Sequence, residues 1–198
     1  LILVEPLAHD IRPEWTVRIE GVSPIEEVGL EGFSIVFPSV LYRGHHKEAG
    51  YNGIFIEQSR HGWVRDVEVT NADSGLIVDA SQQVTLKEIA INGREGHYPV
   101  KIGGGSGVLV RDFKFTAQEL HNPSFNTEAA GSVYCHGVIE NARLDQHNGA
   151  NHQNLFDDIE IRGDPAKLFD HGGSESYRPT AGAFNTFWNL RLVSGSAG

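Results

Sequence analysis

The sequence predicts an all-β fold in the form of a parallel β-helix (β-solenoid) of about seven coils. Three observations support this prediction: a short apolar pattern recurs along the chain, a second apolar run precedes several of its copies, and helical periodicity is nowhere sustained. Short strands that recur every 20 to 30 residues are typical of solenoids, in which each repeat buries its apolar face against the next repeat.

The recurring pattern is an apolar residue, any residue, a polar residue or glycine, and then two apolar residues separated by one position. Its copies read LEGFSI, VRDVEV, LKEIAI, VRDFKF, IENARL, FDDIEI and FWNLRL. The polar residue or glycine is expected at a corner, because Asn, Asp and Gly tolerate tight backbone conformations. The first apolar residue after each corner is expected in an internal stack formed by Phe33, Val67, Ile89, Phe113, Ala142, Ile159 and Leu190.

A second set of short apolar runs gives each repeat two strands. GIFIE begins at Gly53, GLIVD at Gly75, PVKIG at Pro99 and SVYCHG at Ser132. A β-sandwich also has short strands at regular spacing and is the competing prediction. The uneven spacing of the repeats is attributed to loops inserted into individual coils, which in solenoids often form the binding face.

The chain of 198 residues is long enough for one domain over residues 1–198, or it is a fragment of a longer protein. The net charge of −10 argues against a nucleic-acid partner, which normally requires an excess of basic residues. No apolar run is long enough for a membrane span. The single cysteine, Cys135, excludes an intramolecular disulfide and is expected to be a small packing residue.

Four stretches carry a resemblance to a known superfamily: GWVRDVEVTNAD, VLVRDFKF, LDQHNGANHQNLFDDI and AGAFNTFWNLRL. The chain resembles the pectate-lyase-like proteins, in particular a poorly characterised bacterial group. The resemblance implies a right-handed, single-stranded parallel β-helix that acts on polysaccharides and is secreted or periplasmic. The order of His136-Gly137 and Asp157-Asp158 does not match polygalacturonase-type hydrolases, so their mechanism is not transferred.

The densest polar stretch, LDQHNGANHQNLFDD from Leu144, supplies the predicted catalytic residues: His147, His152, Asp145 and Asp157. A histidine accepts a proton at neutral pH, and a carboxylate on its other nitrogen fixes its tautomer. Asn154 is expected to orient one imidazole. The predicted substrate-binding residues are Asn154, His171, Asp170, His97, Lys101 and Arg65. The loops that carry His97, His121, His147 and His171 are expected on one side of the solenoid.

Two other surface features are candidates for contact with a sugar. RGHHKEAGYNG, from Arg43, is a further candidate loop in which Tyr51 could stack on a sugar. Arg65, Lys87 and Arg111 occupy the same place in three repeats, so they form either a track for acidic sugars or a surface ladder neutralised by Asp66, Glu88 and Asp112.

The predicted function is cleavage of a polysaccharide or oligosaccharide, with an acidic polymer favoured, by a lyase or a glycoside hydrolase. A non-catalytic carbohydrate-binding or structural β-helix is the alternative. No cofactor is predicted and no metal ligand is assigned, because the spacing of His147, His152 and Asp145 matches no familiar zinc motif. A divalent cation is left open.

Overall fold

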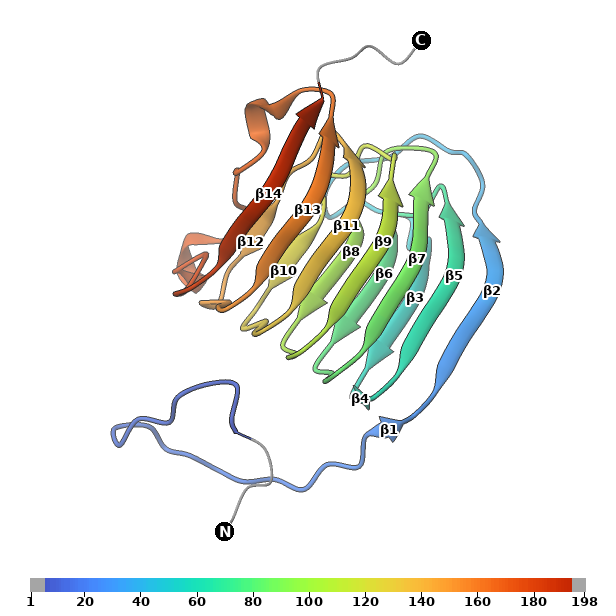
Figure 1. Cartoon of the computed structure of the whole chain (residues 1–198). Helices are drawn as coiled ribbons and strands as arrows, with labels where there is room; N and C mark the ends of the chain where they lie inside the picture. Colours follow the sequence, from blue (N-terminus) through green and yellow to red (C-terminus); the bar gives the residue numbers. More distant parts are fainter. Residues whose placement is uncertain (1–5, 194–198) are drawn as a thin grey trace.

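The computed structural model describes residues 6–193 and shows an all-β chain wound into a parallel β-solenoid of about five turns (Figure 1). The prediction of stacked parallel strands is therefore confirmed, and the sandwich alternative is excluded. One sheet has seven strands: β2 (Gly29–Val36), β5 (Trp63–Thr70), β7 (Thr85–Asn92), β9 (Leu109–Phe115), β11 (Val133–Glu140), β13 (Leu155–Arg162) and β14 (Thr186–Val193).

The second sheet has five strands, and each follows a strand of the first sheet along the chain. They are β3 (Asn52–Glu57), β6 (Ser74–Asp79), β8 (Tyr98–Gly103), β10 (Ser124–Asn126) and β12 (Asp145–His147). Within residues 6–193, neither β13 nor β14 is followed by a strand of this sheet. The segment between them contains two short 3₁₀ helices, η1 (Pro165–Lys167) and η2 (Glu175–Tyr177).

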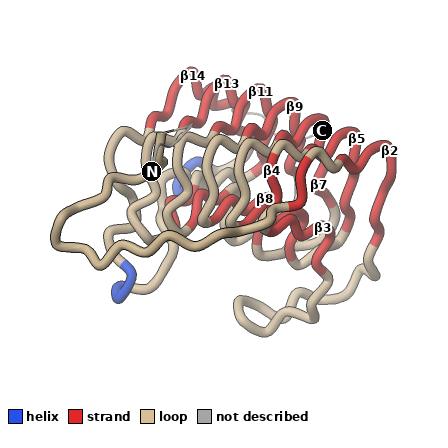
Figure 2. The backbone as a smooth tube through the Cα atoms, turned by 90° about the horizontal axis from the view of Figure 1, so that it is seen from below, coloured by secondary structure: helices blue, strands red, loops and turns tan. Residues whose placement is uncertain are grey.

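A short third side closes the coils between the two sheets. It is formed by single β-bridges that run from Arg60 through Gln82, Ser106 and Ala130 to His152. The segment before β2 runs along this side, and within it β1 (Ile25–Glu26) pairs with β4 (Ser59–Arg60). Figure 2 shows this segment as a long loop beside the stacked turns.

The interior is filled by residues that repeat at the same register in successive strands. In the seven-stranded sheet the aligned residues are Phe33, Val67, Ile89, Phe113, Gly137, Ile159 and Leu190. The inner members are buried, whereas Phe33 is 38% exposed and Leu190 is only partly buried. The two end residues lie in the outermost strands, where only one neighbouring coil covers them.

The structure corrects one repeat. The rung between β9 and β13 is VYCHGVIE and not IENARL, so Gly137 takes the ladder position expected of Ala142. Ala142 is buried but lies beyond the end of β11. His136 replaces the usual Asp or Asn of the pattern and lies 24 positions after Asp112 and 22 before Asp158, so the spacing is regular from Asp66 to Asp158.

The recurring polar residue lies inside each strand rather than at a corner between strands. Its φ angle is positive in every rung, from 48° at Asn189 to 70° at Gly32. This residue is skipped in the strand pairing, while the residues on both sides of it are paired. Each strand of the seven-stranded sheet therefore bends at the same register.

The described residues contain only these two three-residue 3₁₀ helices, and neither has the length or the apolar character to cross a bilayer.

Candidate functional site: a histidine cluster

The turns that lead into the five-stranded sheet carry polar side chains at equivalent positions of successive coils. The backbone N–H of Asp73 donates to Tyr51 O, that of His97 to Asp73 O, and that of His121 to His97 O, at 2.7, 2.6 and 3.0 Å. Residues that lie 22 or 24 positions apart in the sequence are therefore stacked directly on one another. This stacking is why two histidines separated by a full coil lie side by side.

Four imidazoles and one carboxylate form a group that we call the histidine cluster: His45, His97, His121, Asp145 and His147. The ring centroids of His97 and His121 are 5.3 Å apart, and those of His121 and His147 are 4.7 Å apart. His45 reaches the cluster from the loop between β2 and β3, with its centroid 4.5 Å from that of His97. Tyr98 stacks on His97 at 3.9 Å and on His121 at 5.1 Å.

Asp145 is the first residue of β12 and is fully buried. Its Oδ2 accepts a hydrogen bond from Ser124 Oγ at 2.7 Å and lies 3.0 Å from His147 Nδ1. Its Oδ1 accepts from the backbone N–H of Gly172 at 2.5 Å. The carboxylate is thereby held in place, and it fixes the proton of His147 on Nδ1.

His121 differs from the other rings because it is buried and makes no hydrogen bond. Its side chain is 4% exposed, and Nδ1 lies 3.2 Å from Asp145 Oδ2. The contact is electrostatic in nature, since neither ring nitrogen reaches hydrogen-bond geometry with any described residue. A backbone element also covers this ring, because a Cβ at Gly172 would overlap both His121 and His147.

The loop that supplies His45 also supplies a second carboxylate. Glu48 Oε1 lies 3.1 Å from His97 Nδ1 and accepts a hydrogen bond from Tyr42 at 3.1 Å. The Nε2 atom of His97 is buried and has no hydrogen-bond partner among the described residues. Glu48 therefore holds the Nδ1 side of His97 as Asp145 holds that of His147.

Burial and mutual repulsion favour the neutral form of two of these imidazoles, His97 and His45. Desolvation, with further contributions from the neighbouring His121 and His45, lowers the pKa of His97 to about 3. Desolvation also lowers the pKa of His45. Burial would raise the pKa of the Asp145 carboxyl, but its contacts with His121 and His147 outweigh burial and hold that pKa below its usual range.

One coil earlier, the equivalent position is occupied by a buried ion pair. Asp73 Oδ1 lies 2.6 Å from Arg94, with the two side chains 3% and 8% exposed. Asp73 Oδ2 accepts two further hydrogen bonds, from the backbone N–H groups of Gly50 and Tyr51 at 2.8 Å each. This pair anchors the end of the loop that carries His45 and Glu48 to the body of the solenoid.

The structure brings several predicted residues together. His97, Asp145 and His147 belong to the histidine cluster, and His171 Nδ1 accepts a hydrogen bond from the backbone N–H of Gln146 in β12 at 3.3 Å. Lys101 is the register partner of Ser124, which is in turn the partner of Asp145. Asp170 lies at the edge of this region, 3.7 Å from Arg143.

Two residues predicted from the same stretch lie elsewhere. His152 belongs to the third side, where its Nε2 lies 2.9 Å from Ala8 O and its ring packs against His9. Asn154 is buried and bonds the backbone: its Oδ1 accepts from Ser132 N at 3.0 Å and its Nδ2 donates to Ala129 O at 2.9 Å. Asn154 therefore braces neighbouring coils and orients no imidazole.

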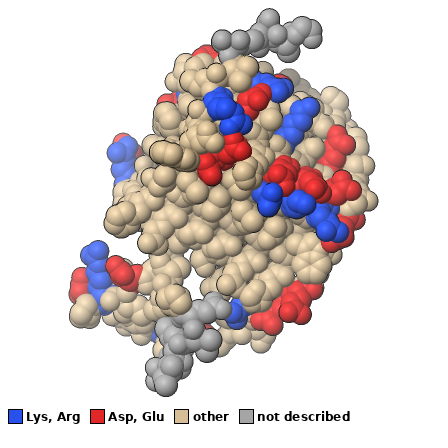
Figure 3. All heavy atoms as spheres, viewed as in Figure 1, with Lys and Arg blue, Asp and Glu red and all other residues tan. Residues whose placement is uncertain are grey.

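Asp157 and Arg65 lie on the seven-stranded sheet, apart from the histidine cluster. Asp157 pairs in register with Cys135 and Trp188. Arg65 forms an ion pair with Glu31 at 2.7 Å, and Lys87 and Arg111 pair with Glu88 and Asp112. Figure 3 shows acidic and basic atoms side by side on this face. The column of basic residues is therefore a neutralised surface ladder, in which Glu31 takes the place predicted for Asp66.

The sequence marked RGHHKEAGYNG as a candidate loop, but no individual role was predicted for His45 or Glu48 within it, and none for Tyr98. The sequence signal for the first two was the long insertion between β2 and β3, which contains adjacent histidines at positions 45 and 46. The signal for Tyr98 was its place next to His97 at the start of an apolar run. Neither signal reveals which coil the insertion folds back upon.

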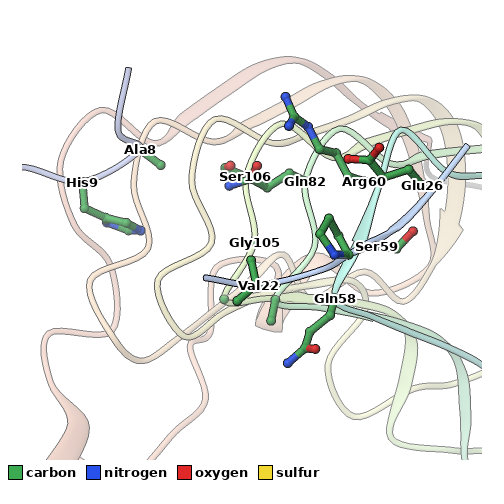
Figure 4. Close-up of a pocket in the computed structure, with 13 residues that line it drawn as sticks. Ala8, His9, Val22, Glu26, Gln58, Ser59, Arg60, Gln82, Gly105 and Ser106 are labelled. Carbon is green, nitrogen blue, oxygen red and sulfur yellow. The ribbon is translucent and has the colours of Figure 1, made fainter. Parts of the chain in front are cut away.

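A pocket of about 540 Å³ lies on the third side, beneath the segment that precedes β2. Figure 4 shows Arg60, Gln82 and Ser106 lining it on one side, with Ala8 and His9 on the other. Its lining lacks the paired imidazole and carboxylate groups found in the histidine cluster, which remains the candidate site.

Comparison of the chain with family models, curated proteins and solved structures finds no match. The solenoid fold and the histidine cluster are thus the observations from which a function must be argued, and a fold alone does not identify a function.

Proposed function

We propose that this protein cleaves an acidic polysaccharide, acting as a lyase. The proposal retains the right-handed winding that the pectate-lyase-like resemblance implies, and with it a secreted or periplasmic location. The Asp145–His147 pair supports the proposal most directly. It is a proton acceptor held in one tautomer by a buried carboxylate, with Nδ1 and Oδ2 3.0 Å apart.

A lyase removes the proton next to a uronate carboxyl group and needs a base positioned for that proton. Because Asp145 engages Nδ1 of His147, the proton acceptor is Nε2, and the partly exposed ring is accessible at 14% of its side-chain surface. In this proposal His147 contacts the substrate, and Asp145 acts as a positioning residue. Lys101 and His171 are proposed to bind the polymer on either side of the pair.

The geometry favours a lyase over a glycoside hydrolase. A hydrolase needs two carboxyl groups across the scissile bond, about 5–5.5 Å apart for retention or 6.5–9.5 Å for inversion. The carboxylates near His147 already have partners, since Asp145 bonds Ser124 and Gly172, Glu48 bonds Tyr42, and Asp73 bonds Arg94. Asp157, the predicted acid partner, lies on the other sheet.

The stacking of the coils also suits a polymeric ligand. Equivalent positions of successive coils are separated by about 4.8 Å in a β-sheet, so the polar row from Tyr51 to His121 and on to Asp145 extends along the solenoid. A linear chain of sugars lying along this side of the solenoid would cross several coils in turn. The same property would serve a non-catalytic carbohydrate-binding protein, which is the second candidate.

The test is incubation of the 198-residue protein with a panel of acidic and neutral polysaccharides. Unsaturated products, detected by ultraviolet absorbance, identify a lyase, and new reducing ends without such absorbance identify a hydrolase. Retention of the polymer on immobilised protein, without any cleavage, would replace the lyase proposal by the binding protein. Neither cleavage nor binding of any acidic polymer would refute both candidates.

A further inference from the structure

The histidine cluster contains two overlapping groups of side chains of the types that bind metal ions. The first is His45, His97 and His121, and the second is His121, Asp145 and His147; within each group one ligand atom per residue lies within 4.8 Å of the others. Imidazole nitrogens suit zinc and related transition metals, whereas calcium and magnesium prefer oxygen ligands.

His121 belongs to both groups and carries the strongest indication of a ligand. The residue is 3% exposed; its Nδ1 lies 3.2 Å from Asp145 Oδ2, and its buried Nε2 makes no hydrogen bond to a described residue. Buried polar groups in folded proteins nearly always have a partner, so an imidazole of this kind indicates a missing one. The buried and unpartnered Nε2 of His97 is a second case in the adjacent coil.

The carboxylates around the cluster are arranged as they are around bound metals. A metal-binding histidine usually donates its other ring N–H to a carboxylate, which fixes the tautomer and makes the free nitrogen a better ligand. Glu48 takes this position at Nδ1 of His97, at a distance of 3.1 Å, and leaves Nε2 available.

The first group is favoured over the second because Asp145 is already occupied. Its two oxygens accept from Ser124 Oγ and Gly172 N and face the Nδ1 atoms of His121 and His147. In the first group, His97 and His121 each contact a carboxylate through Nδ1, and the Nε2 atom of each has no hydrogen-bond partner among the described residues. We propose that His45, His97 and His121 bind one divalent transition-metal ion of the zinc class.

In the proposed lyase, this ion would add positive charge near a uronate carboxylate beside His147; that role rests on the proposed function, whereas binding of the ion does not. Metal binding is therefore measured without any polysaccharide. The full chain is stripped with a chelator and titrated with Zn²⁺ in competition with a chromophoric chelator. Co²⁺ is added in parallel, because its visible spectrum reports coordination by nitrogen ligands.

The wild-type protein is expected to bind one Zn²⁺ per chain. Loss of an outer-shell partner typically lowers metal affinity about tenfold to a hundredfold, so His45→Ala, which removes a ligand from an exposed loop, should lower it by at least about a hundredfold. His97→Asn should act similarly. The matched control is His46→Ala, which removes the exposed neighbour of His45 and should leave affinity within a few-fold of the wild type.

Three results would overturn the proposal. Absence of stoichiometric Zn²⁺ binding by the wild type is the first. Equal losses in His45→Ala and His46→Ala would show nonspecific binding to the loop. A large loss in His147→Ala with none in His45→Ala would assign the ion to the second group. Circular dichroism of each variant shows that the solenoid is intact.

Discussion

The aromatic ring of Phe113 occupies the space that a Cβ on Gly137 would fill in the neighbouring coil. The two residues are register partners in adjacent strands, β9 and β11, and the ring packs in the buried ladder. A large residue in one rung is thus compensated by glycine in the next.

Gly137→Ala is expected to destabilise the protein by about 1–3 kcal/mol, because the added methyl group overlaps the Phe113 ring in a closely packed interior. Denaturant unfolding measures the change. Gly21→Ala is the control, since nothing lies within 4 Å of the added carbon there. The double variant Phe113→Leu, Gly137→Ala should recover part of the loss; additive losses would show that the two residues do not compete for space.

Phe113→Ala is expected to lower the free energy of unfolding by roughly 3–5 kcal/mol, because the side chain is 3% exposed and its removal leaves a cavity in the ladder. Phe55→Ala, which truncates a residue that is 56% exposed, should have a much smaller effect. Similar losses in the two variants would mean that burial in the ladder does not determine stability.

The ionised carboxylate of Asp73 is expected to stabilise the fold at neutral pH, and this stabilisation is expected to be lost at acid pH. Burial alone would raise its pKa, but the hydrogen bond from Arg94 and those from backbone N–H groups lower it below the usual value. The stabilisation is therefore fully present above the unfolded-state pKa of about 4 and is lost as pH falls toward the lower folded-state pKa. Asp73→Asn should lower the free energy of unfolding by about 3 kcal/mol at pH 7, and this difference should shrink below pH 4.

Unfolding of the wild type and of Asp73→Asn is compared at a series of pH values. Asp10→Asn, in the exposed segment before β2, is the control and should run parallel to the wild type at every pH. A constant difference between wild type and Asp73→Asn down to strongly acid pH would show that the pair is not linked to protonation of this carboxyl.

His147→Ala is expected to reduce cleavage of the polysaccharide at least about a hundredfold, since general base assistance is typically worth 10²–10⁴ in rate. His152→Ala is the matched control, because this histidine packs against Ala8 and His9 on the third side and should retain near wild-type turnover. Equal activity of both variants would remove His147 from the reaction, and selective loss in His152→Ala would move the site to the third side.

The fold was predictable because each coil of a solenoid corresponds to one local repeat of the sequence. Val67, Ile89 and Phe113 could be aligned without any knowledge of long-range contacts. The repeat at β11 was missed because its positive-φ residue is His136 rather than Asp, Asn or Gly. The sequence pattern therefore placed this repeat at Asn141, five positions too late. The sequence did not reveal that the bend lies within the strand, since bends and corners favour the same residues.

The site was predictable where spacing along the chain equals one coil, as for His97 and His121. The prediction that His152 lies beside His147 was wrong, because the turn between these positions takes the chain from the five-stranded sheet to the third side. The place of His45 depends on how a long loop folds back, which is set by its buried anchor at Asp73 and Arg94. Such tertiary contacts have no periodic signal.

The segment before β2 touches the solenoid at both ends of its length. It pairs with the first coil through β1 and β4, and its Ala8 carbonyl meets His152, 144 positions further along the chain. A solenoid held only by contacts between neighbouring coils can fray from its ends one repeat at a time. Because this segment joins the first coil to a distant one, unfolding of one coil removes contacts of the other. The repeats should therefore unfold together in a single cooperative transition.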